Sequence, residues 1–208
     1  MLKKIKSLLG MAAFGIASLM LCSAASATVL TAKTNVDNGY QIYLSTSDSV
    51  QGSLFGQGNN WYNTFTNSIS LVAGTDYFLH LYAYDQGGIA GLLGAFSLTG
   101  TDHQFVNGLT SLTTNTTNWK GNNTGWGAPY TSLVDIAANG SGVWGGAFTG
   151  GVSPAAHWIW AGDANNNDQA WFSTKIVAQN KVPEPSSTLL FAVGMIGLAF
   201  LRFKKAAK

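Results

Sequence analysis

Seven tryptophans are the residues of this chain best suited to binding chemistry. The rings of Trp and Tyr present flat apolar faces that stack on the C–H faces of sugars, and their polar edges form hydrogen bonds. Several of these rings lie in segments rich in Asn, Asp and Thr, whose side chains bind hydroxyl groups. The predicted carbohydrate-binding residues are Trp61, Tyr62, Trp119, Trp126, Tyr130 and Trp144. The alternative is that these loop aromatics pack onto the ends of the sheets.

The other three tryptophans lie in β-rich runs. They are Trp158, Trp160 and Trp171. We expect them to fill the hydrophobic core rather than to bind a ligand, because large aromatic side chains in strands dominate the packing of cores.

A run of Asp and Asn, "DANNND", could hold a metal ion. Asp163, Asn165 and Asn167 have the spacing of the first three oxygen ligands of a Ca²⁺ loop, with Asp168 beside them. The sixth position is Asp168 rather than Gly, and the twelfth is Thr174 rather than Glu. The alternative is a hairpin turn, for which Asn and Asp are typical. We expect no cofactor, with Ca²⁺ as the one alternative, and Asp85 beside two glycines is a second oxygen-rich position.

Catalytic chemistry has little support in the sequence. His80, His103 and His157 are far apart, and no nucleophile elbow, zinc spacing or phosphate loop accompanies them. Glu184 is the single glutamate, which excludes a glycosidase with paired glutamates, although a pair of aspartates remains open. We therefore expect a protein that is not an enzyme, with a glycan hydrolase as the alternative.

The elements that must position these side chains are strands. Short alternating or β-rich runs are separated by clusters of Gly, Asn, Asp and Ser, and we find no helical periodicity between Thr28 and Asn180. The predicted strands lie within residues 29–34, 39–46, 63–72, 75–85, 92–99, 131–137, 156–161 and 169–177. About eight strands at this spacing predict a single antiparallel β-sandwich over residues 28–180. Residues 114–128 and 138–153 are predicted to be long loops.

Three segments resemble the galactose-binding-like jelly-roll domains of surface and carbohydrate-active proteins. The run from Asp37 to Leu44 is similar to the family's "YxVYLNG" strand, although the Asn-Gly turn after Leu44 is absent. Residues 85–98 resemble the family's Gly-rich turn and following strand, and residues 157–176 its Trp-bearing hairpin. The resemblance implies an all-β, jelly-roll-like sandwich, and it leaves the function open because one fold hosts many functions.

The first 27 residues have the pattern of a secretory signal peptide. Three lysines precede the apolar run 8–21, and Ala25-Ser26-Ala27 supplies the small residues of a cleavage site. An uncleaved anchor or a lipoprotein at Cys22 are the alternatives. Cleavage would remove Cys22, the only cysteine, so the mature protein would depend on its hydrophobic core without disulfides.

The last segment, residues 181–208, combines a stiff break, a short apolar helix and a basic end. Pro185 restricts Glu184 to extended conformations, so Pro183-Glu184-Pro185 cannot continue a strand or helix. A helix over the 18 residues 186–203 would be about 27 Å long, a marginal span of a hydrocarbon core of about 30 Å. The basic cluster that begins at Arg202 favours the cytoplasmic side.

This three-part order resembles the PEP-CTERM sorting signal of Gram-negative bacteria, with Pro183, Glu184, Pro185 and Arg202 as its motif residues. The resemblance implies a transient inner-membrane anchor, processing by an exosortase-like membrane protease, and a setting of exopolysaccharide and biofilm-like matrix. It implies an inner-membrane-anchored precursor that becomes a cell-surface or extracellular protein. A simple tail anchor is the alternative.

Charge excludes one class of partner. Between the leader and the Pro-Glu-Pro break, residues 28–182 contain four lysines and eight aspartates, so this region carries a net charge of −4 although the whole chain is +2. An acidic domain lacks the basic surface that nucleic-acid phosphates require. The sequence therefore predicts an exported, non-enzymatic surface or matrix protein, with a carbohydrate-binding module as the alternative.

Overall fold

A computed structural model describes residues 27–145 and 150–179. Within these ranges the chain forms twelve strands and one short 3-10 helix, η1. The bounds are β1 Thr28–Asp37, β2 Gly39–Ser45, β3 Ser53–Gly58, β4 Phe65–Leu71, β5 Tyr77–Tyr84, β6 Gly91–Leu98, β7 His103–Phe105, β8 Ser111–Thr113, β9 Lys120–Asn122, β10 Leu133–Ala138, η1 Gly142–Trp144, β11 His157–Ala161 and β12 Gln169–Ala178.

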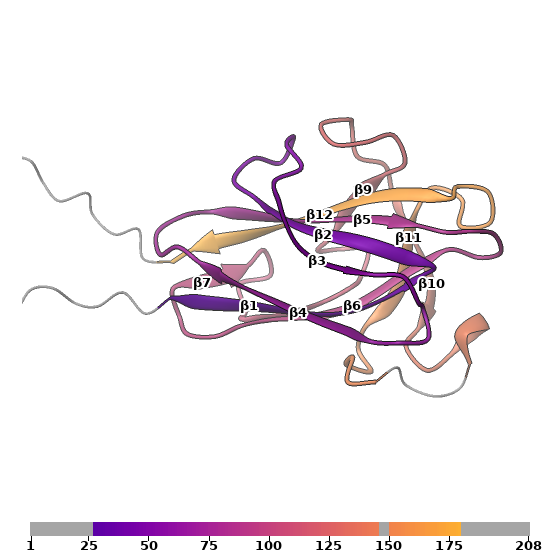
Figure 1. Ribbon diagram of the computed structural model, residues 1–208, viewed down its shortest axis with the longest axis horizontal. Helices are drawn as coiled ribbons and strands as arrows, with labels where there is room; N and C mark the ends of the chain where they lie inside the picture. Colours follow the sequence, from indigo (N-terminus) through magenta and orange to yellow (C-terminus); the bar gives the residue numbers. More distant parts are fainter. Residues whose placement is uncertain (1–26, 146–149, 180–208) are drawn as a thin grey trace, which may run out of the picture.

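The strands form two sheets that pack face to face, as the two layers of Figure 1 show. The first sheet has the order β10-β11-β6-β1-β4, and β8 also pairs with β6. The second has the order β3-β2-β5-β12-β7, and β9 also pairs with β12. Each of these pairings is antiparallel. The predicted all-β, antiparallel β-sandwich is confirmed.

All eight predicted strands are present, but four short strands were not predicted. These are β3, β7, β8 and β9. The segment 120–122 lies inside a predicted loop, yet it pairs with Trp171, Phe172 and Ser173 of β12. The sequence of β9, Lys-Gly-Asn, has no strand propensity. Its strand geometry comes from the unpaired edge of β12, which is a tertiary contact.

Alternation along the strands sends one set of side chains into the core. Leu79 and Leu81 of β5 are fully buried between the sheets, as are Ile42 of β2 and Phe172 of β12. A smaller cluster forms around Leu93 beside the segment that precedes β11.

Two of the three predicted core tryptophans are buried. Trp160 packs in the main core, and Trp158 packs in the smaller cluster with Leu93 and Val152. The prediction for Trp171 is wrong, because this side chain is only partly buried and alternates with the buried Phe172 on the opposite face of β12.

The predicted signal peptide and sorting segment lie outside the described residues, apart from Ala27. Within the described ranges, no helix has the length and apolar character needed to cross a membrane.

Candidate functional site

The outer face of the second sheet carries a row of partly buried aromatic side chains. Trp171 on β12 lies directly opposite Tyr82 on β5, with ring centroids 5.1 Å apart and planes inclined by 41°. Tyr84 is two residues further along β5, and its ring centroid is 6.1 Å from that of Tyr82. We call these three residues the aromatic row. Three strands hold the row in place, since Gln41 of β2 lies opposite Tyr82 on its other side.

A glycine allows the ring of Tyr84 to lie across the neighbouring strand. Gly39 of β2 is the cross-strand partner of Tyr84. A Cβ atom at Gly39 would lie 2.5 Å from the Tyr84 hydroxyl oxygen and 2.8 Å from the Gly58 carbonyl oxygen. These separations are shorter than van der Waals contact, so the missing side chain creates the space that the tyrosine occupies.

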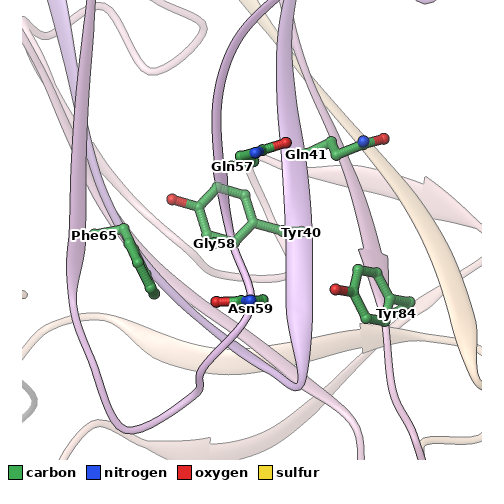
Figure 2. A pocket seen from close by; sticks show the side chains of 7 residues that line it. All are labelled: Tyr40, Gln41, Gln57, Gly58, Asn59, Phe65 and Tyr84. Carbon is green, nitrogen blue, oxygen red and sulfur yellow. The ribbon is translucent and has the colours of Figure 1, made fainter.

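The aromatic row continues into a pocket of about 370 Å³, which Figure 2 shows from close by. We call it the amide pocket. It is lined by Tyr40, Gln41, Gln57, Gly58, Asn59, Phe65 and Tyr84. Its volume falls in the lower part of the range for small-molecule sites. Tyr84 belongs to both features, so row and pocket form one continuous surface over β12, β5, β2 and β3.

The inner wall of the amide pocket is closely packed. The Tyr40 ring packs edge-on against Phe65 with centroids 6.3 Å apart, and the Asn67 amide donates to the Tyr40 hydroxyl at 2.9 Å. A Cβ atom at Gly58 would lie 2.6 Å from both rings. The wall therefore consists of the two rings packed directly on the backbone of Gly58, and Tyr40 is almost fully buried.

A second polar group on the same face lies beneath the segment that follows β9. Asp48 accepts hydrogen bonds from the hydroxyls of Ser173, at 2.6 Å, and Tyr130, at 2.7 Å, and its Oδ1 lies 3.6 Å from Nε2 of His80. The indole of Trp126 covers the imidazole of His80, with ring centroids 4.4 Å apart. We call Asp48, His80, Trp126, Tyr130 and Ser173 the histidine cluster.

Burial and hydrogen bonding shift the pKa values of this cluster. Burial lowers the pKa of His80, and the hydrogen bond to the Gln51 carbonyl and the nearby Asp48 carboxylate oppose that shift. For Asp48, burial is the largest influence and raises the pKa, but the hydrogen bonds from Ser173 and Tyr130, together with the nearby His80, lower it overall. Burial raises the pKa of Tyr130 to about 12. Near neutral pH the cluster therefore contains a neutral imidazole and a charged carboxylate.

Ser, His and Asp meet in this cluster, but their geometry differs from that of an activated nucleophile. The Ser173 hydroxyl donates to Asp48, and His80 is fully buried beneath Trp126. An activating base must itself accept the proton of the hydroxyl. The arrangement instead ties the segment that carries Trp126 and Tyr130 to the sheet.

The predicted loop aromatics are not brought together into one site. Trp61 and Tyr62 form an edge-on pair in the β3–β4 connection, where Tyr62 is 79% exposed. Trp119 lies in the core, 5.0 Å from Phe96 between ring centroids, so its faces are not open to a sugar.

The remaining predicted aromatics have structural contacts of their own. Trp126 and Tyr130 belong to the histidine cluster. The indole N–H of Trp144 donates to Asp37 at 2.9 Å, and its ring stacks on Trp158 at 4.1 Å. Burial raises the pKa of Asp37, and the bond from Trp144 opposes that shift.

The Asp and Asn run forms the turn between β11 and β12. Oδ1 of Asp163 accepts from the Asn165 backbone N–H at 2.9 Å, and Oδ2 accepts from the Asn166 amide at 2.6 Å. The side-chain oxygen of Asn167 accepts from the backbone N–H of Asp163 at 2.7 Å. The backbone carbonyl of Asp168 accepts from the backbone N–H of Asp85 at 2.8 Å. Among the residues the structure describes, no group of three or more His, Cys, Asp or Glu is placed to hold a metal ion. The geometry matches the hairpin-turn interpretation of this run.

Neither the aromatic row nor the amides of the pocket were predicted as site residues. The alternation of inward and outward side chains along the strands nevertheless indicated where the row lies. Along β12, every second position is occupied by Trp171, Ser173 and Lys175. These side chains therefore share one face of the strand, and the polar Ser and Lys indicate that it is the outer face. Tyr82 and Tyr84 are two positions apart in β5, so they also share one face. Nothing local identifies Gln57 or Asn59, because β3 itself was not predicted.

Comparison with known proteins bears on the end of the chain. The profile of the PEP-CTERM protein-sorting motif matches residues 181–205. The chain carries a PEP-CTERM sorting motif. The predicted motif residues Pro183, Glu184, Pro185 and Arg202 all lie within the match and outside the described structure. The PEP-CTERM motif directs export through a membrane-anchored precursor and processing by exosortase, a membrane enzyme. No curated protein and no solved structure matches the chain.

Proposed function

We propose that this PEP-CTERM protein is a non-enzymatic cell-surface or matrix protein whose β-sandwich binds exopolysaccharide through the aromatic row. The observation that carries the proposal is the placement of Trp171 and Tyr82, 5.1 Å apart on the outer face of the sheet. Rings held on strands lose little conformational freedom when a ligand stacks on them, which favours binding.

The position of the row relative to the sorting motif supports the same function. Trp171 lies near the start of β12, and the strand ends at Ala178. Seven residues of strand separate these two points by about 23 Å. Figure 1 shows the start of β1 and the end of β12 at the same end of the molecule. A precursor held at its sorting segment would therefore present the row away from the membrane.

Retention of the full-length chain on immobilised exopolysaccharide of the producing bacterium tests the proposal. A detergent without a sugar headgroup avoids competition for the site. Replacing both rings in W171A/Y82A should weaken retention about tenfold or more, because each aromatic contact contributes about 0.5–1.5 kcal/mol. An unchanged thermal unfolding midpoint would show that the double variant is folded. Lack of retention of the natural chain, or equal retention of the double variant, would contradict the proposal.

Tyr62→Ala provides the matched control and tests the other aromatic candidate. Tyr62 is exposed and belongs to the predicted loop site rather than the aromatic row. We expect Y62A to bind like the natural chain, and a loss confined to Y62A would instead assign binding to the loop pair. Incubation with the same polysaccharide should release no new reducing ends, whereas release abolished by Asp or His substitutions would favour the hydrolase.

A further inference from the structure

The amide pocket has no charged side chain in its lining. Three primary amides, three aromatic rings and a glycine surround it. The described residues as a whole carry three lysines and eight aspartates, a net charge of −5. The pocket therefore lies in an acidic domain and offers no cation to a negatively charged ligand.

Two of the three amides are free to bind a ligand. Across residues 27–145 and 150–179, the side chains of Gln57 and Asn59 are exposed and make no hydrogen bond, whereas Gln41 accepts from the Tyr43 hydroxyl at 2.6 Å. That bond fixes the Gln41 carbonyl oxygen toward Tyr43, so its NH₂ group remains as a donor. A primary amide offers two donors and one acceptor in a plane. Pairs of hydroxyl groups, which both donate and accept, complement such groups.

The amide pocket and the aromatic row share Tyr84, so one ligand can occupy both. Tyr84 lines the pocket, and Tyr82 and Trp171 extend from it along the sheet. A ligand that fills the pocket and reaches the row must be longer than one sugar ring. A polysaccharide segment fits this requirement, with one residue in the pocket and its neighbours on the row.

We infer that the amide pocket binds an uncharged sugar residue and makes the protein selective for neutral over acidic polysaccharides. The inference rests on the proposed function, because it assigns a ligand class to the same surface. A sugar carboxylate would enter the pocket without a cationic partner, and the amide donors alone would return less than its lost hydration. The net negative charge of the domain would also repel an acidic chain.

Binding of the full-length chain to two sets of immobilised polymers tests the inference. Dextran and galactomannan are the neutral probes, and alginate and hyaluronan are the acidic ones. We expect retention on at least one neutral polymer and at least about tenfold weaker retention on both acidic ones, since an unpaired buried charge costs more than the hydrogen bonds return. The double variant Q57A/N59A should lose about tenfold on the neutral polymer, because two hydrogen-bonding amides are removed.

Gln104→Ala is the matched control, because Gln104 lies on β7 at the other edge of the same sheet. We expect Q104A to bind like the natural chain. Equal retention on acidic and neutral polymers, or unchanged binding by Q57A/N59A, would overturn the inference while leaving glycan binding through the row intact. Failure of all four polymers together with the producer's own polysaccharide would instead overturn the proposed function, and the inference with it.

Discussion

The imidazole of His80 lies nearly parallel to the indole of Trp126, with ring centroids 4.4 Å apart and planes inclined by 22°. His80 projects from the centre of the second sheet, and Trp126 comes from the segment that follows β9. The contact covers one part of the outer face and leaves the aromatic row on the adjoining part uncovered. The histidine cluster therefore sets the boundary of the candidate site.

Removing the covering ring should raise the pKa of His80. Burial is the main cause of its lowered pKa, so Trp126→Ala should move the value toward the ordinary 6.5. The same change should reduce the free energy of unfolding by about 2 kcal/mol, less than for a fully buried tryptophan. An NMR titration of the imidazole measures the first effect and chemical denaturation the second. Trp126→Phe preserves a ring over the imidazole and should retain most of the shift. A pKa that stays low in W126A would contradict this account.

The histidine cluster should make the folded state less stable in mild acid. The folded-state pKa of His80 is below its unfolded value of 6.5, so the unfolded chain takes up the proton first as the pH falls. The stabilising contribution is fully present above about pH 6.5 and is lost as the pH drops toward the lowered pKa. Denaturant unfolding from pH 7.5 to 5 should show this decline, and His80→Gln should make the profile flatter. If both profiles have the same slope, His80 does not cause the decline.

A lower pH range should reveal the contribution of Asp48. Its folded-state pKa is below the ordinary 3.8, so its stabilisation is present above that value and is lost as the pH falls through the lowered pKa. Asp48→Asn should reduce stability at pH 7, because Ser173 and Tyr130 lose a charged acceptor, and should make unfolding less dependent on pH below 4. Unfolding curves of natural and variant chains at pH 2 to 7 measure both effects. An identical acid dependence in the variant would contradict the assignment.

Gly39→Ala should disturb the site without changing any ligand-contacting side chain. The added Cβ would lie 2.5 Å from the Tyr84 hydroxyl oxygen, so the ring must move off β2. We expect a loss of about 1–3 kcal/mol in unfolding free energy, typical of overpacking, and weaker retention on neutral polysaccharide. Gly150→Ala is the control, because its Cβ would meet its nearest atom at an ordinary 3.5 Å. Retention unchanged by G39A would show that the position of Tyr84 does not matter for binding.

Substitutions in the sorting motif should prevent processing of the precursor. Glu184 stands between Pro183 and Pro185 within the matched motif. Glu184→Ala should leave most of the protein as the membrane-associated precursor, whereas the nearby Ser187→Ala should be processed normally. Intact mass of the protein recovered from cell and medium locates both cut sites. Efficient release of the E184A protein at the natural mass would show that processing does not depend on this glutamate.

The strand pattern made the interior of this protein predictable. In β5 the alternation of Tyr77, Leu79 and Leu81 with Phe78 and His80 fixed which side chains share a face. This worked because successive side chains of a strand point to opposite faces, whatever the strand packs against. The sorting motif was equally accessible, since it is a linear signal that needs no fold to be recognised.

Alternation could not show which parts of a face other segments would cover. Trp171 was predicted to lie in the core because it is a large aromatic residue in a strand. It shares a face of β12 with Ser173 and Lys175, however, and that face points away from the core. His80 shares its face with Tyr82, yet Trp126 buries His80 and leaves Tyr82 partly open.

The sequence by itself determined the class of fold, the buried positions of the longer strands and the export signal, because each depends on neighbouring residues. The tertiary structure decided where a ligand could bind. Asp48 meets Ser173 across 125 positions of the chain, and Gly39 faces Tyr84 only through the register of β2 and β5. Contacts between distant segments depend on sheet order and register, which result from packing the whole chain at once.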